Sequence, residues 1–426
     1  MTVTADDEEA TYARVTRRIL PFLFLCYVVA FLDRVNVGFA KLQMLADLQL
    51  SDAVYGAGAG IFFVGYFLFE VPSNILLERV GARRWIARIM ITWGVLSALM
   101  AFVSGKASFY LLRFALGAAE AGFFPGIILY LTYWYPAARR ARIVALFMLA
   151  IAFAGVVGGP FSGWVLSAGL PGLRGWQWLF VAEAVPSILI GLWVPFYLSD
   201  GVADAAWLSE DEKALLTRNL AAGRREVRDL SVVQTLKNPW VLLFSLVYFC
   251  ISAGLYGISF WLPQVIRNAG VSDTVNVGLL AAVPYGSAAV AMVLVGRSSD
   301  RSGERRWHFA LSAVVGGLGL IGSALAGPHL ALAVAALALA TCGVLSSFPV
   351  SWTMPTAILG GTAAAAGIAL VNSIGGLAGY VSPLVVGWIS ERTHRLDYGL
   401  YVVAGCMFAG AVLVIVLVPA RSSSRR

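Results

Sequence analysis

Stretches of about 20 apolar residues recur along the whole chain, separated by short polar connections. A helix of this length crosses the ~30 Å hydrocarbon core of a bilayer. Helices are expected because each segment in lipid must satisfy its own backbone hydrogen bonds, and the runs lack the short alternation of barrel strands. The pattern predicts an all-α membrane protein with twelve spans, at approximately residues 18–42, 54–78, 85–103, 107–134, 142–168, 176–198, 239–267, 276–297, 307–325, 329–354, 362–391 and 399–419.

Composition agrees with this class: 59% of the residues are hydrophobic and 13% are charged, against ~25% charged in soluble domains. The net charge of +8 does not indicate nucleic-acid binding, because no soluble domain is left to carry a basic face. Most Lys and Arg residues fall at the two termini and in the even-numbered connections. This bias predicts that both termini are cytoplasmic. Frequent Ala and Gly, with Arg far more common than Lys, indicate a bacterial source.

No pattern for catalysis or metal binding stands out. The four cysteines lie in four different spans, and the three histidines form no cluster, so we expect no disulfide, metal or cofactor. The chain also lacks a nucleophile–His pair and a phosphate-binding loop. We therefore expect that the protein is not an enzyme.

The longest polar stretch, residues 199–238, divides the spans into six plus six. Four of its leucines have the spacing of an amphipathic helix lying along the membrane: Leu208, Leu215, Leu216 and Leu220. The expected organisation is a cytoplasmic tail (1–17), a six-helix half (18–198), a cytoplasmic central loop (199–238), a second six-helix half (239–419) and a cytoplasmic tail (420–426).

The two halves share a loop motif. An acid, an arginine, a glycine and two more arginines recur at matching steps after span 2 and after span 8. Such repetition at equivalent positions indicates duplicated halves. We interpret these residues as conformational latches, with glycine permitting the tight turn. They are Glu78, Arg79, Gly81, Arg83 and Arg84 in the first loop, and Asp300, Arg301, Gly303, Arg305 and Arg306 in the second.

These loops resemble the signature of the major facilitator superfamily. The stretches FLDRVNVGFA (31–40) and LRFALGAAEAGFFPG (112–126) are similar, more narrowly, to its anion:cation symporter family. Further similar stretches are 65–90, 254–266 and 372–383. The resemblance implies a secondary transporter of the bacterial inner membrane that takes up sugar acids, dicarboxylates or aromatic acids by alternating access.

Four charged residues lie far from the end of any span: Asp33, Arg34, Arg113 and Glu120. A lone charge at mid-bilayer costs roughly 2.5–3.5 kcal/mol, so such residues need partners or a water-filled cavity. Asp33 and Arg34 lie about 5 Å to the outer side of the midpoint of their helix, and Arg113 lies about 10 Å further out than Glu120. We expect the two cations and two anions to form a closed ionic network in the empty cavity.

A substrate carboxylate would give an arginine a better, bidentate partner, and the released acid could then take up a proton. We therefore assign substrate binding to Arg34 and Arg113, and proton coupling to Asp33 and Glu120. The resemblance implies the same roles. The alternative is a purely structural ionic network. Further cavity candidates are Tyr66, Tyr256, Asn372 and Trp352, with Asn372 and Tyr66 favoured by the resemblance.

Glu70 and Glu183 lie nearer the ends of their spans, and we expect structural roles for them, with a loop arginine as the expected partner of Glu70. The anion itself stays open among a sugar acid, a tartrate-like diacid and an aromatic acid. A proton-coupled antiporter or efflux pump of the same fold is the alternative function, because the glycine–proline string of span 5 resembles that of antiporters. The expected partners are an organic anion, protons and the lipid bilayer, and the expected state is a monomer.

Overall fold

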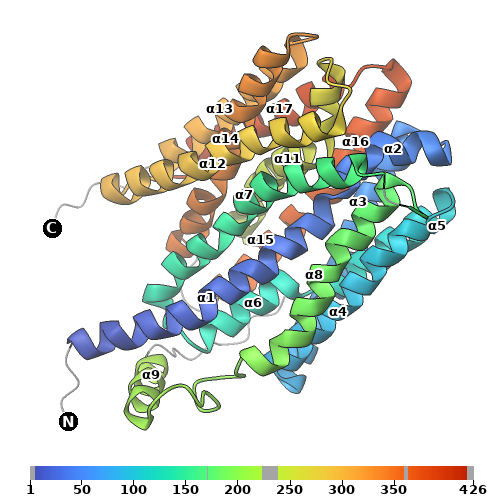
Figure 1. Cartoon of the computed structure of the whole chain (residues 1–426). Helices are drawn as coiled ribbons and strands as arrows, with labels where there is room; N and C mark the ends of the chain where they lie inside the picture. Colours follow the sequence, from blue (N-terminus) through green and yellow to red (C-terminus); the bar gives the residue numbers. More distant parts are fainter. Residues whose placement is uncertain (1–4, 170, 223–237, 359–362, 420–426) are drawn as a thin grey trace.

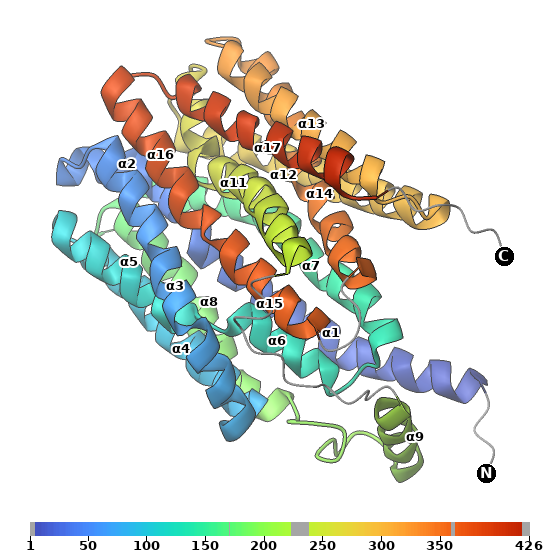
Figure 2. The same ribbon diagram turned by 180° about the vertical axis from the view of Figure 1, so that it is seen from behind.

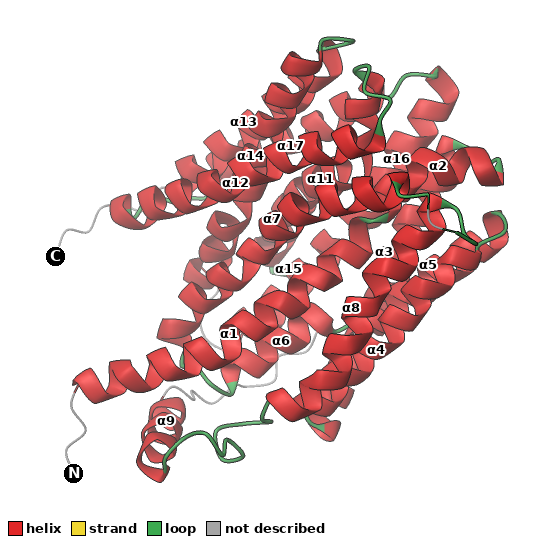
Figure 3. Ribbon diagram, in the orientation of Figure 1, coloured by secondary structure: helices red, strands yellow, loops and turns green. Residues whose placement is uncertain are grey.

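The computed structural model describes residues 5–169, 171–222, 238–358 and 363–419. Within these residues Figure 3 shows helices and loops without any strand. The helices are α1 (Ala5–Val35), α2 (Val37–Leu48), α3 (Asp52–Val80), α4 (Ala82–Leu99), the short 3₁₀ helix η1 (Met100–Phe102), α5 (Lys106–Glu120), α6 (Phe123–Thr132), α7 (Ala137–Ser167), α8 (Gly175–Tyr197), α9 (Glu210–Ala222), α11 (Pro239–Asn268), α12 (Thr274–Ser302), α13 (Arg306–Leu325), α14 (Leu330–Ile358), α15 (Ala363–Gly376), α16 (Ala378–Thr393) and α17 (Asp397–Leu417).

The described helices form twelve spans that are long and apolar enough to cross a membrane, which confirms the predicted number. Three of the spans consist of two helices in line: α1 with α2, α5 with α6, and α15 with α16. Large apolar side chains cover the outside of the bundle, where lipid replaces water. Examples are Phe102, Leu111, Phe196 and Val416, each more than half exposed.

Two groups of six spans lie side by side in the bundle (Figures 1 and 2). The first runs from α1 to α8 and the second from α11 to α17. They meet chiefly where α7 packs against α12 and where α3 packs against α16. Helix α1 begins and α17 ends at the same end of the bundle. We call this the terminal end, and the opposite one the distal end.

The two groups touch closely at the distal end because small residues let the backbones approach. A Cβ atom on Gly159 of α7 would lie 2.6 Å from the carbonyl oxygen of Gly278 of α12. A Cβ atom on Gly387 of α16 would lie 2.5 Å from the carbonyl oxygen of Asp52 at the start of α3. Both contacts leave no room for a side chain, so the distal end is closed.

Polar contacts also join the groups at the distal end. The hydroxyl of Tyr55 donates to the carbonyl oxygen of Phe260 at 2.9 Å, and Arg267 donates to the carbonyl oxygen of Leu42 at 2.6 Å. Ser390 donates to the carboxylate of Asp52 at 2.6 Å. These bonds must break whenever this end opens.

The glycine contact gives a first prediction. Replacing Gly278 with leucine should shift the protein towards states open at the distal end, by about 1–3 kcal/mol, since the new side chain overlaps the backbone of Gly159. The measurement is the rate at which a water-soluble maleimide labels Ser390→Cys in a background without native cysteines. Gly296→Leu is the matched control, because its Cβ on the same helix meets nothing within 4 Å. Equal labelling rates in both variants would contradict a closed distal end.

Helical structure extends into two segments that were expected to lie outside the spans, the N-terminal tail and the central loop. Helix α1 starts at Ala5, so the residues expected as a tail extend the first span, with Tyr12 and Val15 buried. In the expected central loop, α9 packs its leucines against the protein, with Leu215 and Leu216 buried. Arg14 of α1 pairs with Glu212 of α9 at 3.0 Å, which holds the two together.

Candidate functional site

Three of the spans break near candidate residues, and one of these breaks is at Gly376, four residues after Asn372. Helix α1 ends at Val35, directly after Asp33 and Arg34, and α5 ends at Glu120. Gly122 occupies the left-handed region at φ +83°, and a Cβ atom on it would collide with the side chain of Ser73. Discontinuous helices are typical of transporter binding sites, because helix ends supply free backbone groups near the bilayer midplane.

Arg34 and Glu120 form a buried ion pair across the first half. The Nε of Arg34 donates to Oε1 of Glu120 at 3.1 Å, and its second guanidinium contact is to the same oxygen. The guanidinium carbon of Arg34 also lies 5.5 Å from the centre of the Tyr66 ring. Arg34 lines the central cavity, so its charge is within reach of a ligand there.

Arg113 is fully buried and does not line this cavity. Its guanidinium donates to the carbonyl oxygens of Gly58 at 3.3 Å and Ala59 at 3.2 Å on α3. The ring of Phe62 is near both arginines, with its centre 4.9 Å from the guanidinium carbon of Arg113 and 5.7 Å from that of Arg34.

Asp33 is also directed away from the cavity. Its carboxylate accepts hydrogen bonds from Trp93 at 3.0 Å and Ser97 at 2.7 Å on α4, and from Ser187 on α8. The four buried charges therefore make one ion pair, Arg34 with Glu120, instead of the expected closed network of four. The reason is that neutral donors of the surrounding helices bind Asp33, and backbone carbonyls accept from two of the three guanidinium nitrogens of Arg113.

The central cavity lies between the two halves and is rich in aromatic rings. Arg34 and Glu70 are its charged residues among those described. Of the candidates from sequence, Arg34, Tyr66, Tyr256 and Asn372 line it. Trp352 does not, but its ring centre lies 4.8 Å from that of Tyr248, which does. The nine aromatic residues of the wall are Tyr27, Phe31, Phe63, Tyr66, Phe67, Phe124, Tyr248, Tyr256 and Phe348.

Glu70 joins the two halves in the wall of the cavity. Its carboxylate accepts from Asn372 at 3.0 Å and from Ser373 at 3.1 Å, both on α15. A loop arginine was the expected partner of Glu70. The structure instead pairs Glu70 with two neutral donors of the other half. Glu70 lies one helical turn beyond Tyr66 on α3, and this spacing was the signal that could have placed it in the cavity.

The first repeated loop binds an acid from outside its own motif. Asp200, just after α8, accepts from the backbone N–H of Arg83 at 3.0 Å and pairs with the Arg83 side chain at 2.9 Å. Gly81 sits at φ +98°, and a Cβ atom there would lie 3.0 Å from the Asp200 carboxylate. The acid thus lies at the positive N-terminus of α4. Sequence reasoning missed Asp200, because nothing in its neighbourhood repeats.

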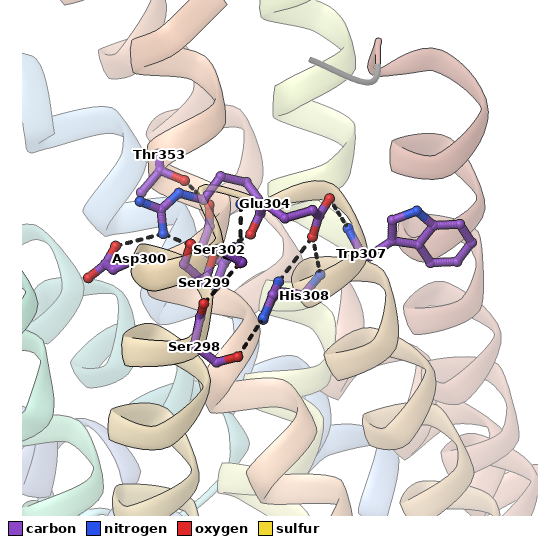
Figure 4. A network of polar contacts seen from close by, with 10 residues as sticks. Ser298, Ser299, Asp300, Ser302, Glu304, Trp307, His308 and Thr353 are labelled. Carbon is purple, nitrogen blue, oxygen red and sulfur yellow. Dashed lines mark hydrogen bonds and ion pairs between the residues drawn. The ribbon is translucent and has the colours of Figure 1, made fainter. Parts of the chain in front are cut away.

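The second loop supplies its own acids (Figure 4). Asp300 pairs with Arg305 at 2.7 Å, and Glu304 accepts from the backbone N–H groups of Trp307 at 2.8 Å and His308 at 3.1 Å. Partial burial acts to raise the pKa of Glu304, but these donors and the His308 ring lower the pKa below its usual value. The ion pairs of both loops stay within one half of the protein.

Comparison with known proteins identifies the family. The model of the Major Facilitator Superfamily matches residues 23–383 and 244–426. A protein of Agrobacterium vitis named "Putative tartrate transporter" is 50% identical over 99% of this chain and 94% of its own length. "Putative metabolite transport protein NicT" of Pseudomonas putida is 48% identical over 98% and 96%. "Quinolone resistance transporter" of Acinetobacter baumannii is 41% identical over 97% and 96%.

Among solved structures, the xylose transporter XylE from E. coli in a partially occluded inward open conformation matches with a TM-score of 0.75. It is 16% identical and covers 94% of this chain and 97% of its own, so it supports the fold alone. The chain belongs to the major facilitator superfamily. It is a transporter and not an enzyme, and its relatives are consistent with anion:cation symporter-type permeases.

Proposed function

We propose that this transporter takes up a small organic anion together with protons, by alternating access across the bacterial inner membrane. The observation that carries the proposal is Arg34, which lines the cavity and forms a buried ion pair with Glu120. An arginine in a largely apolar cavity is a strong binding group for a carboxylate, because its planar fork matches both oxygens. Asn372, Tyr66 and Tyr256 are placed to contact the rest of the substrate.

The same pair offers a coupling step. A substrate carboxylate that binds Arg34 displaces Glu120, which is 1% exposed and then has no ion-pair partner, with the more distant Arg113 as the remaining cation nearby. A carboxyl group so buried favours its protonated form. Binding of the anion and uptake of a proton thus favour each other. Asp33, although held away from the cavity, remains a proposed second carrier, and Arg113 a proposed electrostatic partner of the bound anion.

The closed distal end and the Glu70 contact describe one state of the cycle. With both termini cytoplasmic, the distal end faces the periplasm, and the Glu70 contacts with α15 form a thin barrier towards the cytoplasm. In this state each repeated loop pairs within its own half. We propose that the loops engage the opposite half, and act as latches, when the terminal end closes. The proposed functional unit is a monomer.

The charges of the cavity favour one kind of anion. The described wall offers one guanidinium, one carboxylate and nine rings. A tartrate-like diacid would place its second carboxylate without a cation partner and near Glu70, which costs free energy in an apolar site. A flat acid with one carboxylate can instead stack on the rings. We therefore expect aromatic monocarboxylates to bind more tightly than the diacid in the names of some relatives.

A thermal-shift panel on the purified protein tests the proposal. Benzoate, galactonate and tartrate are compared at two pH values, with Arg34→Ala as the control for binding at the cavity. We expect stabilisation by benzoate, greater at the lower pH and absent from the control. Stabilisation by none of the anions contradicts organic-anion transport. Greater stabilisation by tartrate contradicts only the preference for a single carboxylate.

Export of a drug in exchange for protons is the second candidate function. It is favoured by the 41% identity to the quinolone resistance protein and by the aromatic wall, which also suits large flat molecules. Cells that express the transporter would then accumulate less of a fluorescent quinolone. Greater accumulation of labelled benzoate in the same cells favours uptake of organic acids.

A further inference from the structure

A second buried carboxylate lies beside Asp33. Glu183 of α8 is 4% exposed and accepts a hydrogen bond from Ser162 of α7 at 2.8 Å. The side chain of Asn36 lies next to it. Asn36 is 2% exposed, and neither its amide nitrogen nor its amide oxygen has a hydrogen-bond partner among the described residues. The second oxygen of Glu183 also lacks one.

The helix geometry sets Glu183 one turn further towards the distal end than Asp33. Asp33 and Asn36 are three residues apart at the end of the first helix, and Glu183 and Ser187 are four apart on α8. Such residues occupy one helix face. Helices α1 and α8 run in opposite directions, and Ser187 donates to Asp33. Asn36 therefore faces Glu183, in the next layer towards the distal end.

Neither carboxylate has an ion-pair partner among the described residues. The charged neighbour of Glu183 is Asp33, and that of Asp33 is Glu120, which is another acid. Arg34 is already paired with Glu120. With Glu183 the buried group therefore holds three carboxylates and, counting Arg113, two guanidinium groups. The four charges expected from the sequence cancel, but adding Glu183 leaves the buried group with one negative charge in excess.

Helices packed against α8 supply no further cation to this pair. On α2, Lys41 pairs with Asp52 at 2.9 Å, and Asp47 pairs with Arg174. The arginines of α4 and α7 lie in the first two turns of each helix, at the terminal end. They are Arg83, Arg84 and Arg88 on α4, and Arg139, Arg140 and Arg142 on α7.

We propose that Asp33 and Glu183, one helical turn apart in depth, form a shared proton-binding site whose two carboxylates carry one proton in total. Two carboxylates buried in adjacent layers disfavour double ionisation, because neither has an ion-pair partner among the described residues to compensate the second charge. The hydrogen-bond partners of the site among the described residues are neutral: Ser162 donates to Glu183, and Ser187, Ser97 and Trp93 donate to Asp33. The hydroxyl groups and the unpaired amide of Asn36 next to Glu183 can donate or accept, so they suit either protonation state. The site adds a proton to the proposed transport cycle, but its occupancy does not depend on any substrate.

Infrared difference spectroscopy of the full-length protein in lipid tests the site without substrate. The carbonyl stretch of a protonated carboxylic acid is followed while the pH of the buffer is raised. We expect a band at neutral pH that is lost in Glu183→Gln and also in Asp33→Asn, since either change leaves a single carboxylate that can ionise. Ser162→Ala should retain the band at a shifted frequency, because a hydrogen bond to it is removed.

The variants separate the alternatives. A band that survives in both Glu183→Gln and Asp33→Asn overturns the site. A band lost in Glu183→Gln but unchanged in Asp33→Asn shows that Glu183 is protonated independently of Asp33. This result overturns the proposal that the two carboxylates share one proton. The wild-type protein could instead show no band, with sodium altering its melting temperature only when Glu183 is present. In that case the site binds sodium, and the proposal that it binds a proton is overturned. Benzoate binding measured on the same samples reports on the proposed function separately.

Discussion

Replacing Arg34 with alanine is expected to abolish uptake of the organic anion. The loss of charged hydrogen bonds to a carboxylate corresponds to about 1.5–3 kcal/mol, so affinity should fall by roughly one to two orders of magnitude. Arg34→Lys should recover part of the affinity, because lysine keeps the charge but lacks the planar fork. The measurement is equilibrium binding of labelled benzoate to purified protein.

This substitution also leaves Glu120 buried without its partner, which alone could destabilise the fold by about 3–5 kcal/mol. The double variant Arg34→Ala with Glu120→Gln separates the two effects, since it removes both charges of the pair. We expect it to melt close to the wild-type temperature and still to bind benzoate roughly one to two orders of magnitude more weakly than the wild-type protein. Binding of wild-type affinity by a well-folded double variant would exclude Arg34 as the carboxylate-binding residue.

Replacing Glu120 with glutamine is expected to uncouple anion binding from protons. In the proposed cycle, substrate binding frees Glu120 to take up a proton, so affinity should rise as the pH falls, with a limiting slope of about tenfold per pH unit for one proton. In Glu120→Gln the amide neither competes for Arg34 nor takes up a proton. Affinity should therefore be higher at high pH and much less dependent on pH. Accumulation driven by a pH gradient should be lost.

Counterflow provides the control, because exchange of labelled for unlabelled substrate needs no net movement of protons. We expect Glu120→Gln to retain counterflow in proteoliposomes. A variant that loses counterflow as well has lost transport itself, and Glu120 would then be a structural partner of Arg34. Unchanged accumulation in both Glu120→Gln and Asp33→Asn would exclude these two acids as the proton carriers.

The sequence predicted the number of spans because the length and composition of an apolar segment are local properties. It also singled out Arg34 and Glu120, since charges far from a span end are rare and costly. The helix breaks at Val35, Glu120 and Gly376 were not predicted. They occur within continuous apolar runs, and the contacts that stabilise them come from other helices, such as Ser73 against Gly122.

The direction of the other buried side chains could not be read from position along one helix. Depth placed Asp33 beside Arg113 and Glu120, but rotation about the helix axis directs it towards Trp93 and Ser97 instead. For a related reason, Glu183 was expected to have only a structural role, and Asp200 was missed. Each obtains its role from a neighbour distant in sequence, Asp33 for the first and the Gly81 turn for the second.

The ion pair of Arg34 has a consequence for small inorganic ions. Glu120 acts as an internal competitor that is tethered at its target, and such intramolecular partners have very high effective concentrations. An anion that offers only its charge, such as chloride, must compete with this partner on equal terms and fails at cellular concentrations. An organic acid also contacts the rings around the cavity, and this additional binding free energy lets it displace Glu120 from Arg34. Chloride should therefore be a poor inhibitor, and the resting carrier should not leak it.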